Sequence, residues 1–275
     1  MSKNVIDITL NNKDVIANST EKKVIKMLLL DRSEYFYNKL TDKEIDKIID
    51  KIGEIKKCVI KTIKSTYIKE QIIHKYSHLK NNVKKITNDL SNMNILEISK
   101  KYKNTPLTII RIILQSYMSK EKVKKIFKNP SLLPSDIYKQ FELAMNNDYY
   151  SISSKKQMQE AINFELKIEE YLIEKKIKYK TQDMLSKEQI EEFGKAINTP
   201  DFLITSDLTI NNKSVNWIDA KNFYGMNSKF IISKINKQIE KYINKYGPGC
   251  IIFSCGYNEK LNFNNVLLLS YDDLE

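Results

Sequence analysis

The chain has 275 residues, of which 41% are hydrophobic, and this is sufficient for the core of one large or two ordinary domains. Its formal net charge is +12 at pH 7. No apolar run reaches the roughly eighteen residues that a membrane-spanning helix needs, so the composition predicts a globular, soluble protein and excludes a membrane-spanning one.

The N-terminus, MSKNVIDITL, lacks the basic and then apolar layout of a secretory signal. We therefore expect an intracellular protein, in the nucleus or the cytoplasm. The three cysteines, Cys58, Cys250 and Cys255, have no metal-binding spacing, and the two histidines lie far from the last two of them. We expect neither a disulfide framework nor a zinc site.

The charge is unevenly divided along the chain. Residues 1–150 contain 29 basic and 17 acidic side chains, a net charge of +12, whereas residues 151–275 contain 17 of each. A biased genome that favours lysine codons would make both halves basic. The split favours one domain that meets a polyanion and a second domain whose acids serve another purpose.

The first half reads as helical. Thr41 and Glu44 fit a capping box, and isoleucines from Ile45 to Ile55 then recur at helical spacing. Residues 94–118 predict two short helices joined by a tight turn, with Thr105 as the cap of the second helix and Pro106 at its first position.

The second of these helices has two predicted faces. Ile110, Ile113, Leu114 and Tyr117 would face inward, and the outer face would carry Thr108, Arg111 and Gln115. One interpretation is a helix-turn-helix whose second helix enters a major groove, so that Thr108, Arg111 and Gln115 bind nucleic acid. The other is an ordinary helical hairpin. The basic surplus favours nucleic acid.

Two prolines in residues 128–136 interrupt the helical pattern, and residues 146–153 read as a linker. We therefore predict a basic helical DNA-binding domain at 1–150 and a second domain at 151–275. The second half predicts a helix over 155–178, polar connecting sequence, strands over 201–210 and 214–222, a helix over 229–246 that ends at Gly247, and two further strands in CIIFSCG and NVLLLSY. The fold class is α+β overall: an all-α N-terminal region, then an α/β domain with a central mixed sheet flanked by helices.

Charged residues interrupt the apolar runs of the second half. In an extended strand Asp219 and Lys221 share a face, and a turn at Asn211-Asn212-Lys213 would fold the preceding strand back and bring Asp201 close to Asp219. Two carboxylates in contact repel each other unless a cation lies between them, and Mg²⁺ prefers oxygen ligands of this kind. Glu165 interrupts the apolar face of the preceding helix, where an unpaired carboxylate is costly.

An acid on a helix, an aspartate at a strand start and Asp-x-Lys on the next strand form the pattern of the PD-(D/E)XK (restriction-endonuclease-like) fold. The segments TPDFLI, VNWIDAKNFYG and KYGPGCIIFSCGY resemble the TPD-motif family of PD-(D/E)XK nucleases, the group that includes the codanin-interacting nuclease of animals. The likeness extends over about residues 94–275. Where the family pattern has Glu-Ser-Lys, this chain has Asp219-Ala220-Lys221.

The resemblance implies a magnesium- or manganese-dependent nuclease. Asp201, Asp219 and the Ala220 carbonyl would hold the ion, Lys221 would orient or deprotonate the attacking water, and Glu165 would hold a metal-bound water or a second ion. Gln238 is a candidate for orienting the site or contacting the nucleic-acid backbone.

Other interpretations stay open. Asp219 and Lys221 could form a surface ion pair, and Gln238 could simply be solvated. The chain could also be a DNA-binding adaptor whose nuclease-like domain holds a codanin-like protein partner. The sequence does not distinguish DNA from RNA or a monomer from a homodimer.

Overall fold

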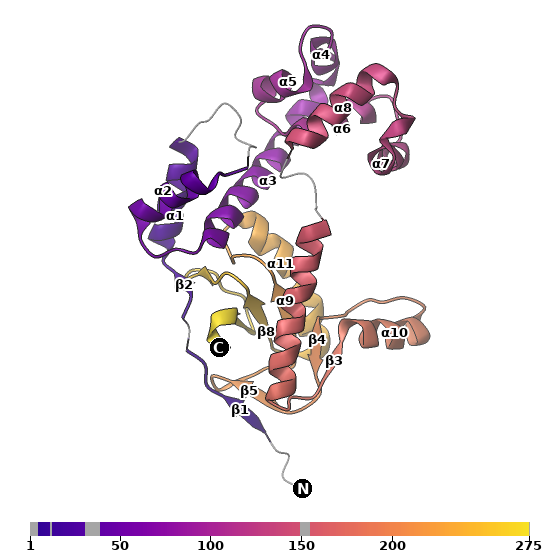
Figure 1. The fold of residues 1–275 in the computed structure, drawn as a ribbon. Helices are drawn as coiled ribbons and strands as arrows, with labels where there is room; N and C mark the ends of the chain where they lie inside the picture. Colours follow the sequence, from indigo (N-terminus) through magenta and orange to yellow (C-terminus); the bar gives the residue numbers. More distant parts are fainter. Residues whose placement is uncertain (1–4, 12, 31–38, 149–154, 275) are drawn as a thin grey trace. The chain divides into compact units, whose positions relative to one another are not determined.

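The computed structural model describes residues 5–11, 13–30, 39–148 and 155–274 (Figure 1). The chain forms two compact units. The first consists of Met1–Ile25, Ile49–Ile63 and Lys155–Glu275, and the second of Lys26–Ile48 and Lys64–Ser154. The division into domains at residue 150 stays a prediction about which parts of the chain fold on their own. Of the predicted linker at 146–153, only residues 146–148 are described, and α8 (Ser135–Asn147) contains the first two of them.

The first unit is built around a five-stranded mixed sheet in the order β10-β8-β7-β4-β3. The bounds of these strands are β3 Tyr179–Thr181, β4 Phe202–Ile204, β7 Trp217–Lys221, β8 Gly249–Phe253 and β10 Val266–Ser270. Strands β7, β8 and β10 run parallel, whereas β3, β4 and β7 are antiparallel neighbours. The mixed sheet and the α+β class agree with the prediction.

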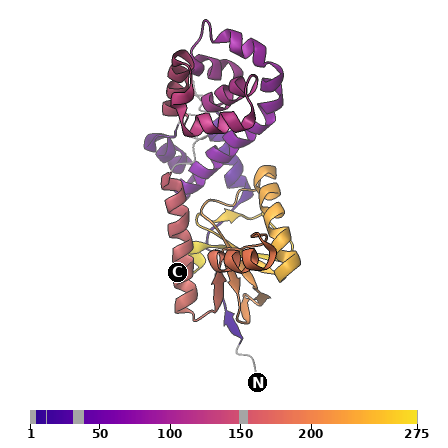
Figure 2. The ribbon, with the colours of Figure 1, turned by 90° about the vertical axis from the view of Figure 1, so that its right-hand side faces the viewer.

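Helices cover both faces of this sheet. Figure 2 shows α9 (Lys155–Glu174) on one side and α11 (Lys229–Tyr246) on the other. On the α9 side Phe164, Ile168 and Leu172 pack against apolar side chains of the strands. On the α11 side Trp217 makes an edge-to-face contact with Tyr242, with ring centroids 5.3 Å apart. The pleat of β7 therefore sends alternate residues to different helices.

The predicted hairpin between residues 201 and 222 is present, in two short pairings. Strand β5 (Leu208–Ile210) pairs with β6 (Lys213–Ser214), and β4 pairs with β7, with Phe202 opposite Ile218. Asn211 and Asn212 both have positive φ, at 51° and 59°. Two consecutive left-handed residues are the conformation that the tight turn of a hairpin requires, and asparagine tolerates it better than most residues.

Several elements of the first unit differ from the prediction. Strands β1 (Ile6–Ile8) and β2 (Val15–Ile16) pair in parallel with β5 and with β9 (Tyr257–Asn258), so the expectation of an all-α N-terminal region is wrong. Helix α9 ends at Glu174, shortly before Lys176 adopts a positive φ of 57°. The sequence that was expected to be a polar connection contains β3 and α10 (Gln182–Phe193).

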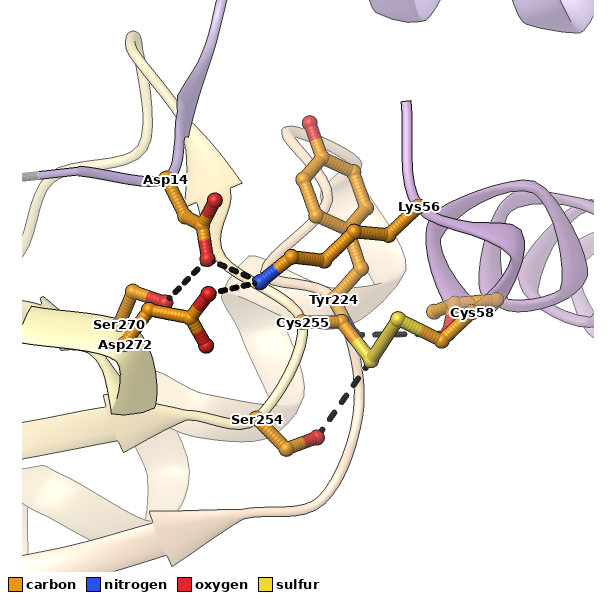
Figure 3. Close-up of a disulfide and its surroundings, with 9 residues drawn as sticks. Asp14, Lys56, Cys58, Tyr224, Ser254, Cys255, Ser270 and Asp272 are labelled. Atoms are coloured by element: carbon orange, nitrogen blue, oxygen red, sulfur yellow. Dashed lines mark hydrogen bonds and ion pairs between the residues drawn. A yellow bond between two sulfur atoms is a disulfide. The ribbon is translucent and has the colours of Figure 1, made fainter. Parts of the chain in front are cut away.

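A disulfide and an ion-pair cluster join N-terminal residues to the C-terminal part of the first unit (Figure 3). Cys58 and Cys255 form the disulfide, with Cα atoms 6.2 Å apart, which corrects the expectation from the cysteine pattern. Nearby, Lys56 forms ion pairs with Asp14 and Asp272. Cys58 and Cys255 lie 197 residues apart in the sequence, Lys56 and Asp272 lie 216 apart, and Lys56 and Asp14 lie 42 apart, so no local pattern reveals these pairings.

The remaining helices are α1 Asn18–Leu30, α2 Asp42–Ile52, α3 Lys57–Asn81, α4 Val83–Asp89, α5 Ile95–Tyr102, α6 Pro106–Gln115, α7 Lys120–Lys128 and α8. The capping box of Thr41 and Glu44 is confirmed, because Thr41 N donates to Glu44 Oε2 at 2.6 Å and Glu44 N donates to Thr41 Oγ1 at 3.3 Å. No helix in the described part of the chain is long and apolar enough to cross a membrane.

Helices α5 and α6 form the predicted helical pair of the second unit. The isoleucines and leucines of α6 enter the apolar core of this unit, as expected. Tyr117 was predicted to face inward but is 51% exposed, because α6 ends at Gln115 and no helical turn directs Tyr117 toward the core.

Candidate active site

A buried ion pair lies on β7. Asp219 is fully buried, and the side chain of Lys221, two residues further along the strand, is 13% exposed and forms an ion pair with Asp219 Oδ2. Both side chains point to the α11 face because residues two apart on a strand share a face. This geometry corresponds to the predicted Asp-x-Lys pair, and its burial distinguishes it from a surface ion pair.

Asp201 lies beside this pair, directly before β4. Its Oδ2 accepts a hydrogen bond from the backbone N–H of Ala220 at 2.7 Å. The pairing of β4 with β7 produces this contact, since Phe202 is opposite Ile218 and places Asp201 at the level of the next residues of β7. The expected approach of Asp201 to Asp219 is therefore present.

The acids of this cluster hold their protons more tightly than usual. Burial and then the charge of Asp219 raise the pKa of Asp201 to about 7, although the Ala220 N–H and Lys221 act in the opposite direction. Burial also raises the pKa of Asp219, against the opposing effect of Lys221. Glu165, which projects from α9, has a pKa raised by burial and by the charge of Asp219. Three carboxyl groups thus share one electrostatic environment.

Gln238 on α11 connects the two members of the ion pair. Its Nε2 donates to Asp219 Oδ1 at 2.9 Å, and its Oε1 accepts from Lys221 Nζ at 2.9 Å. Gln238 Nε2 also donates to the hydroxyl of Tyr242 at 3.1 Å, and that hydroxyl donates to the Thr199 carbonyl at 3.2 Å. Gln238 therefore contacts the ion pair, and the interpretation that it is simply solvated is wrong.

Tyr242 and Thr199 were not singled out from the sequence. Burial and the charge of Asp219 raise the pKa of Tyr242 to about 12, so its hydroxyl keeps its proton at neutral pH. One signal was available in the sequence, because Gln238 and Tyr242 are four residues apart and hence share a face of α11. The network runs from Thr199 of the TPD segment through Tyr242 and Gln238 to Asp219.

A tightly packed tryptophan supports β7, the strand that carries Asp219 and Lys221. Trp217 is fully buried, and its Nε1 donates to the Gly247 carbonyl at 2.9 Å. A Cβ on Gly249 would lie 2.1 Å from the nearest atom of the indole ring, so only glycine fits this position. Trp217 thereby fixes the start of β7 against β8 and the end of α11, as expected for a structural residue.

The donor set suits a hard divalent cation. It consists of two carboxylates and the Ala220 carbonyl, all oxygen donors, and Mg²⁺ commonly takes one or two carboxylates from a protein and keeps several waters. Asp219 Oδ2 is buried and has no aligned hydrogen bond with any described residue, despite its ion pair with Lys221. In the ranges that the structure describes, no three His, Cys, Asp or Glu side chains form a group that could hold an ion. Glu165 therefore does not complete a three-acid cage.

The other predicted nucleic-acid-binding residues lie in the second unit, on α6. Arg111 is exposed, with its guanidinium 4.6 Å from the centre of the Phe127 ring. Gln115 Oε1 accepts a hydrogen bond from the hydroxyl of Tyr76 at 2.9 Å, and the hydroxyl of Thr108 lies 2.8 Å from that of Thr105. These three residues occupy the incompletely buried side of α6, the side on which the sequence predicted them.

Comparison with known proteins identifies the family to which this chain belongs. A family model described as a protein of unknown function with a TPD sequence motif matches residues 134–272, about half of the chain. The chain belongs to this TPD sequence-motif family, and its TPD motif is Thr199-Pro200-Asp201, which contributes Thr199 and Asp201 to the cluster.

The individual proteins that this chain resembles share less than a third of its residues over the matched segments. An uncharacterized protein of Acanthamoeba polyphaga mimivirus is 28% identical over 179 residues, which cover 63% of this chain and 63% of that protein. CDAN1-interacting nuclease 1 of Xenopus laevis is 24% identical over 179 residues, covering 62% of this chain and 57% of the relative. The Homo sapiens protein of the same name is 22% identical over 181 residues, covering 62% of each. The chain thus spans about three-fifths of the length of these relatives. No solved structure matches it.

Proposed function

We propose that this protein is a metal-dependent nuclease of the PD-(D/E)XK type that hydrolyses phosphodiester bonds of DNA, as an endonuclease. The observation that carries the proposal is the buried cluster in which Asp219 and Lys221 share Gln238 beside Asp201. A buried ion pair contributes little net stability to a fold. Its position next to a second carboxylate with a raised pKa favours a catalytic role.

Asp201, Asp219 and the Ala220 carbonyl would hold Mg²⁺ or Mn²⁺. When bound, the ion supplies positive charge that polarises a phosphoryl oxygen and lowers the pKa of water. The carboxyl group of Asp201 must lose its proton to act as a ligand, and its pKa of about 7 allows this near neutral pH. The Ala220 N–H holds Asp201 Oδ2 in place, which orients the other carboxylate oxygen.

Lys221 would provide the positive charge that stabilises the transition state of phosphodiester hydrolysis. Its ammonium group is held by Asp219 and by Gln238 Oε1, so it is oriented before a substrate arrives. At this position it would stabilise the negative charge that develops on the phosphate and orient the attacking water. Glu165 shares the electrostatic environment of Asp219 and would accept a hydrogen bond from that water.

The basic first half of the chain would hold the nucleic acid. Residues 1–150 carry the whole net charge of +12, and the exposed Arg111 on α6 is suited to contact phosphate or a base edge, together with Thr108 and Gln115. Phosphate contacts of this kind make affinity fall steeply as salt is added.

Cleavage of labelled nucleic acids tests the proposal. We expect wild-type protein to cut DNA substrates, among duplexes, flaps and single strands, in Mg²⁺ or Mn²⁺ but not with chelator. Asp219→Asn should reduce the rate by at least about 100-fold, which is comparable to the loss of one preorganised hydrogen-bond donor of an active site. Glu188→Gln, which breaks the exposed Lys180–Glu188 ion pair of the same unit, is the matched control and should cut normally. Equal cutting by Asp219→Asn would refute the site.

A second candidate function is supported by the names of the relatives. Proteins called CDAN1-interacting nuclease 1 are similar to this chain, which favours an adaptor whose nuclease-like unit holds a codanin-like protein. Binding of wild type to codanin with no cleavage of any substrate in the panel would favour the adaptor over the nuclease.

A further inference from the structure

Helix α11 carries a concentrated positive charge next to the site. It contains five lysines and one acid, Glu240, although the half of the chain to which it belongs contains equal numbers of basic and acidic side chains. The remainder of that half is therefore acidic. A local surplus of this kind is hidden when charge is summed over a whole domain.

Four of these lysines lie on one side of the helix. We call Lys234, Lys237, Lys241 and Lys245 the lysine row; all four are exposed. At about 100° per residue, Lys234, Lys241 and Lys245 lie within about 60° of Gln238 around the helix axis, and Lys237 about 100° away in the same direction. The fifth, Lys229, lies about 180° from Gln238. Other exposed positions away from Gln238 carry Ser233, Glu240 and Asn244.

Gln238 connects the lysine row to the site. The opposite flank of Gln238 is the buried face of α11, formed by Ile231, Ile235, Ile239 and Tyr242. Because Gln238 contacts Asp219 and Lys221 directly, the row lies along the solvent side of the residue that holds the site together. A strand bound to the row would pass beside the cluster.

The described residues leave the ammonium groups of the row without an acidic partner. Among the residues that the structure describes, none of the four forms an ion pair with a carboxylate. Lys245 lies over the rings of Phe193 and Tyr246, with its Nζ 5.7 Å and 5.3 Å from their centres. Lysines that serve only solubility need not gather on one side of a helix, and one-sided like charge is unfavourable unless an anion binds there.

We propose that the lysine row binds the sugar–phosphate backbone of a nucleic-acid strand and leads it past Lys221. The row extends over about 16 Å along the helix axis, since each residue adds about 1.5 Å. One strand of duplex DNA carries a phosphate about every 3.4 Å of its axis, so this length reaches several consecutive phosphates. The inference rests on the proposed function for its substrate class and adds a binding surface that is independent of metal.

Binding in chelator separates this inference from catalysis. Full-length wild type is compared with the triple variant Lys234→Gln, Lys237→Gln and Lys241→Gln by fluorescence anisotropy, with labelled duplex and single-stranded DNA. The control variant combines Lys213→Gln, Lys229→Gln and Lys260→Gln, which removes the same charge from exposed lysines of the same unit. Circular dichroism confirms that each variant is folded.

We expect the row variant to bind at least about 10-fold more weakly near 0.1 M salt and the control variant to stay within about twofold of wild type. The slope of log affinity against log salt should decrease by about 2 for single strands and about 3 for duplex, from about 0.7 and 0.9 per lost contact. The probe that loses more affinity in the row variant is the form of the strand that the row prefers. An unchanged slope in the row variant, or no binding by wild type, would overturn the proposal.

A second readout addresses the basic first half, which could dominate the total affinity. Lysine acetylation, followed by mass spectrometry, reports each ammonium group separately. Bound DNA should slow the acetylation of Lys234 and Lys241 at least about threefold and leave Lys229 unchanged; equal slowing of all three, or of none, would refute the row. If the row is protected but Mg²⁺ supports no cleavage, this inference stands and the nuclease function fails.

Discussion

Gln238 donates a hydrogen bond from Nε2 to Oδ1 of Asp219 over 2.9 Å, across the interface between α11 and β7. The same amide accepts a hydrogen bond from Lys221 through Oε1. An amide side chain can donate to an anion and accept from a cation at once, because it has a donor and an acceptor on the same carbon. The orientation of the charged groups of Asp219 and Lys221 therefore depends on Gln238, which is itself uncharged.

Removal of this amide should misplace Lys221 and Asp219 without removing either charge. We expect Gln238→Ala to lower the rate of metal-dependent cleavage by about 10- to 100-fold, the usual cost of losing a residue that orients metal ligands. Single-turnover cleavage at saturating substrate measures this rate. Asn244→Ala, at an exposed position on the same helix, is the control and should leave the rate unchanged. A variant at Gln238 that cuts like wild type would show that the amide does not orient the site.

The raised pKa of Asp201 predicts an unusual pH dependence in metal-free protein. The carboxyl group has a pKa of about 7 when folded, against 3.8 for its ordinary value, so the folded chain binds the proton more tightly than the unfolded chain. The free energy of unfolding contributed by this group therefore falls as the pH rises from about 4 to about 7. In chelator, Asp201→Asn should have a higher Tm than wild type at pH 8 but not at pH 4.

Divalent metal should reverse this effect in the wild type. At pH 8 a bound cation neutralises the repulsion between Asp201 and Asp219, and ligands that bind only the folded state raise its stability. We expect Mg²⁺ or Mn²⁺ to raise the Tm of wild type and to leave Asp201→Asn unchanged. The same rise in both proteins would show that the ion binds elsewhere.

The contact between Trp217 and Gly249 should be intolerant of any added side chain. Gly249→Ala would place a Cβ 2.1 Å from the indole ring, so the free energy of unfolding should fall by about 3 kcal/mol, the upper part of the usual range for overpacking. Trp217 is the only tryptophan, and hence its fluorescence follows unfolding of this region in denaturant. In a Trp217→Leu background, monitored by circular dichroism, Gly249→Ala should cost less; an equal cost would exclude the indole as the cause.

The Cys58–Cys255 disulfide should stabilise the first unit by closing a loop of 197 residues. We expect Cys58→Ser to lower the free energy of unfolding by about 2–5 kcal/mol. Mass spectrometry of non-reduced peptides should find Cys58 linked to Cys255. The third cysteine, Cys250, is buried, and burial raises the pKa of its thiol, so alkylation of the folded protein should spare it. A peptide that links Cys250 to either partner would contradict this pairing.

Local patterns predicted the parts of the site that depend on strand geometry. The alternation of Trp217, Asp219 and Lys221 and the two asparagines of the turn define a hairpin, and the hairpin brings Asp201 to Ala220. The family resemblance lies in the same segment, and membership of the TPD sequence-motif family is confirmed. The C-terminal end of α11 was also predictable, because glycine commonly follows the last residue of a helix. Gly247 does so here, with a φ of 83°.

Interactions between distant parts of the chain were not predictable in this way. Strand β1 has three residues and pairs with β5 about 200 positions away, so its sequence alone offers no partner. Gln238 lies in a lysine-rich helix where glutamine usually meets solvent, and only the packing of α11 on β7 brings it to Asp219. Helix α10 exposes Met184, Ile190 and Phe193, and without a continuous buried face its period was not evident.

Cleavage by Lys221→Met tests the central claim most directly, because this variant removes the ammonium group that is proposed to be catalytic and leaves both carboxylates. Single-turnover cutting of DNA is measured with Mg²⁺, next to anisotropy for DNA binding and a titration with Mn²⁺ for metal binding. We predict that wild type cuts and that Lys221→Met binds DNA and Mn²⁺ but cuts at least about 100-fold more slowly. Equal cutting by both proteins, or no metal-dependent cutting by wild type, would contradict it.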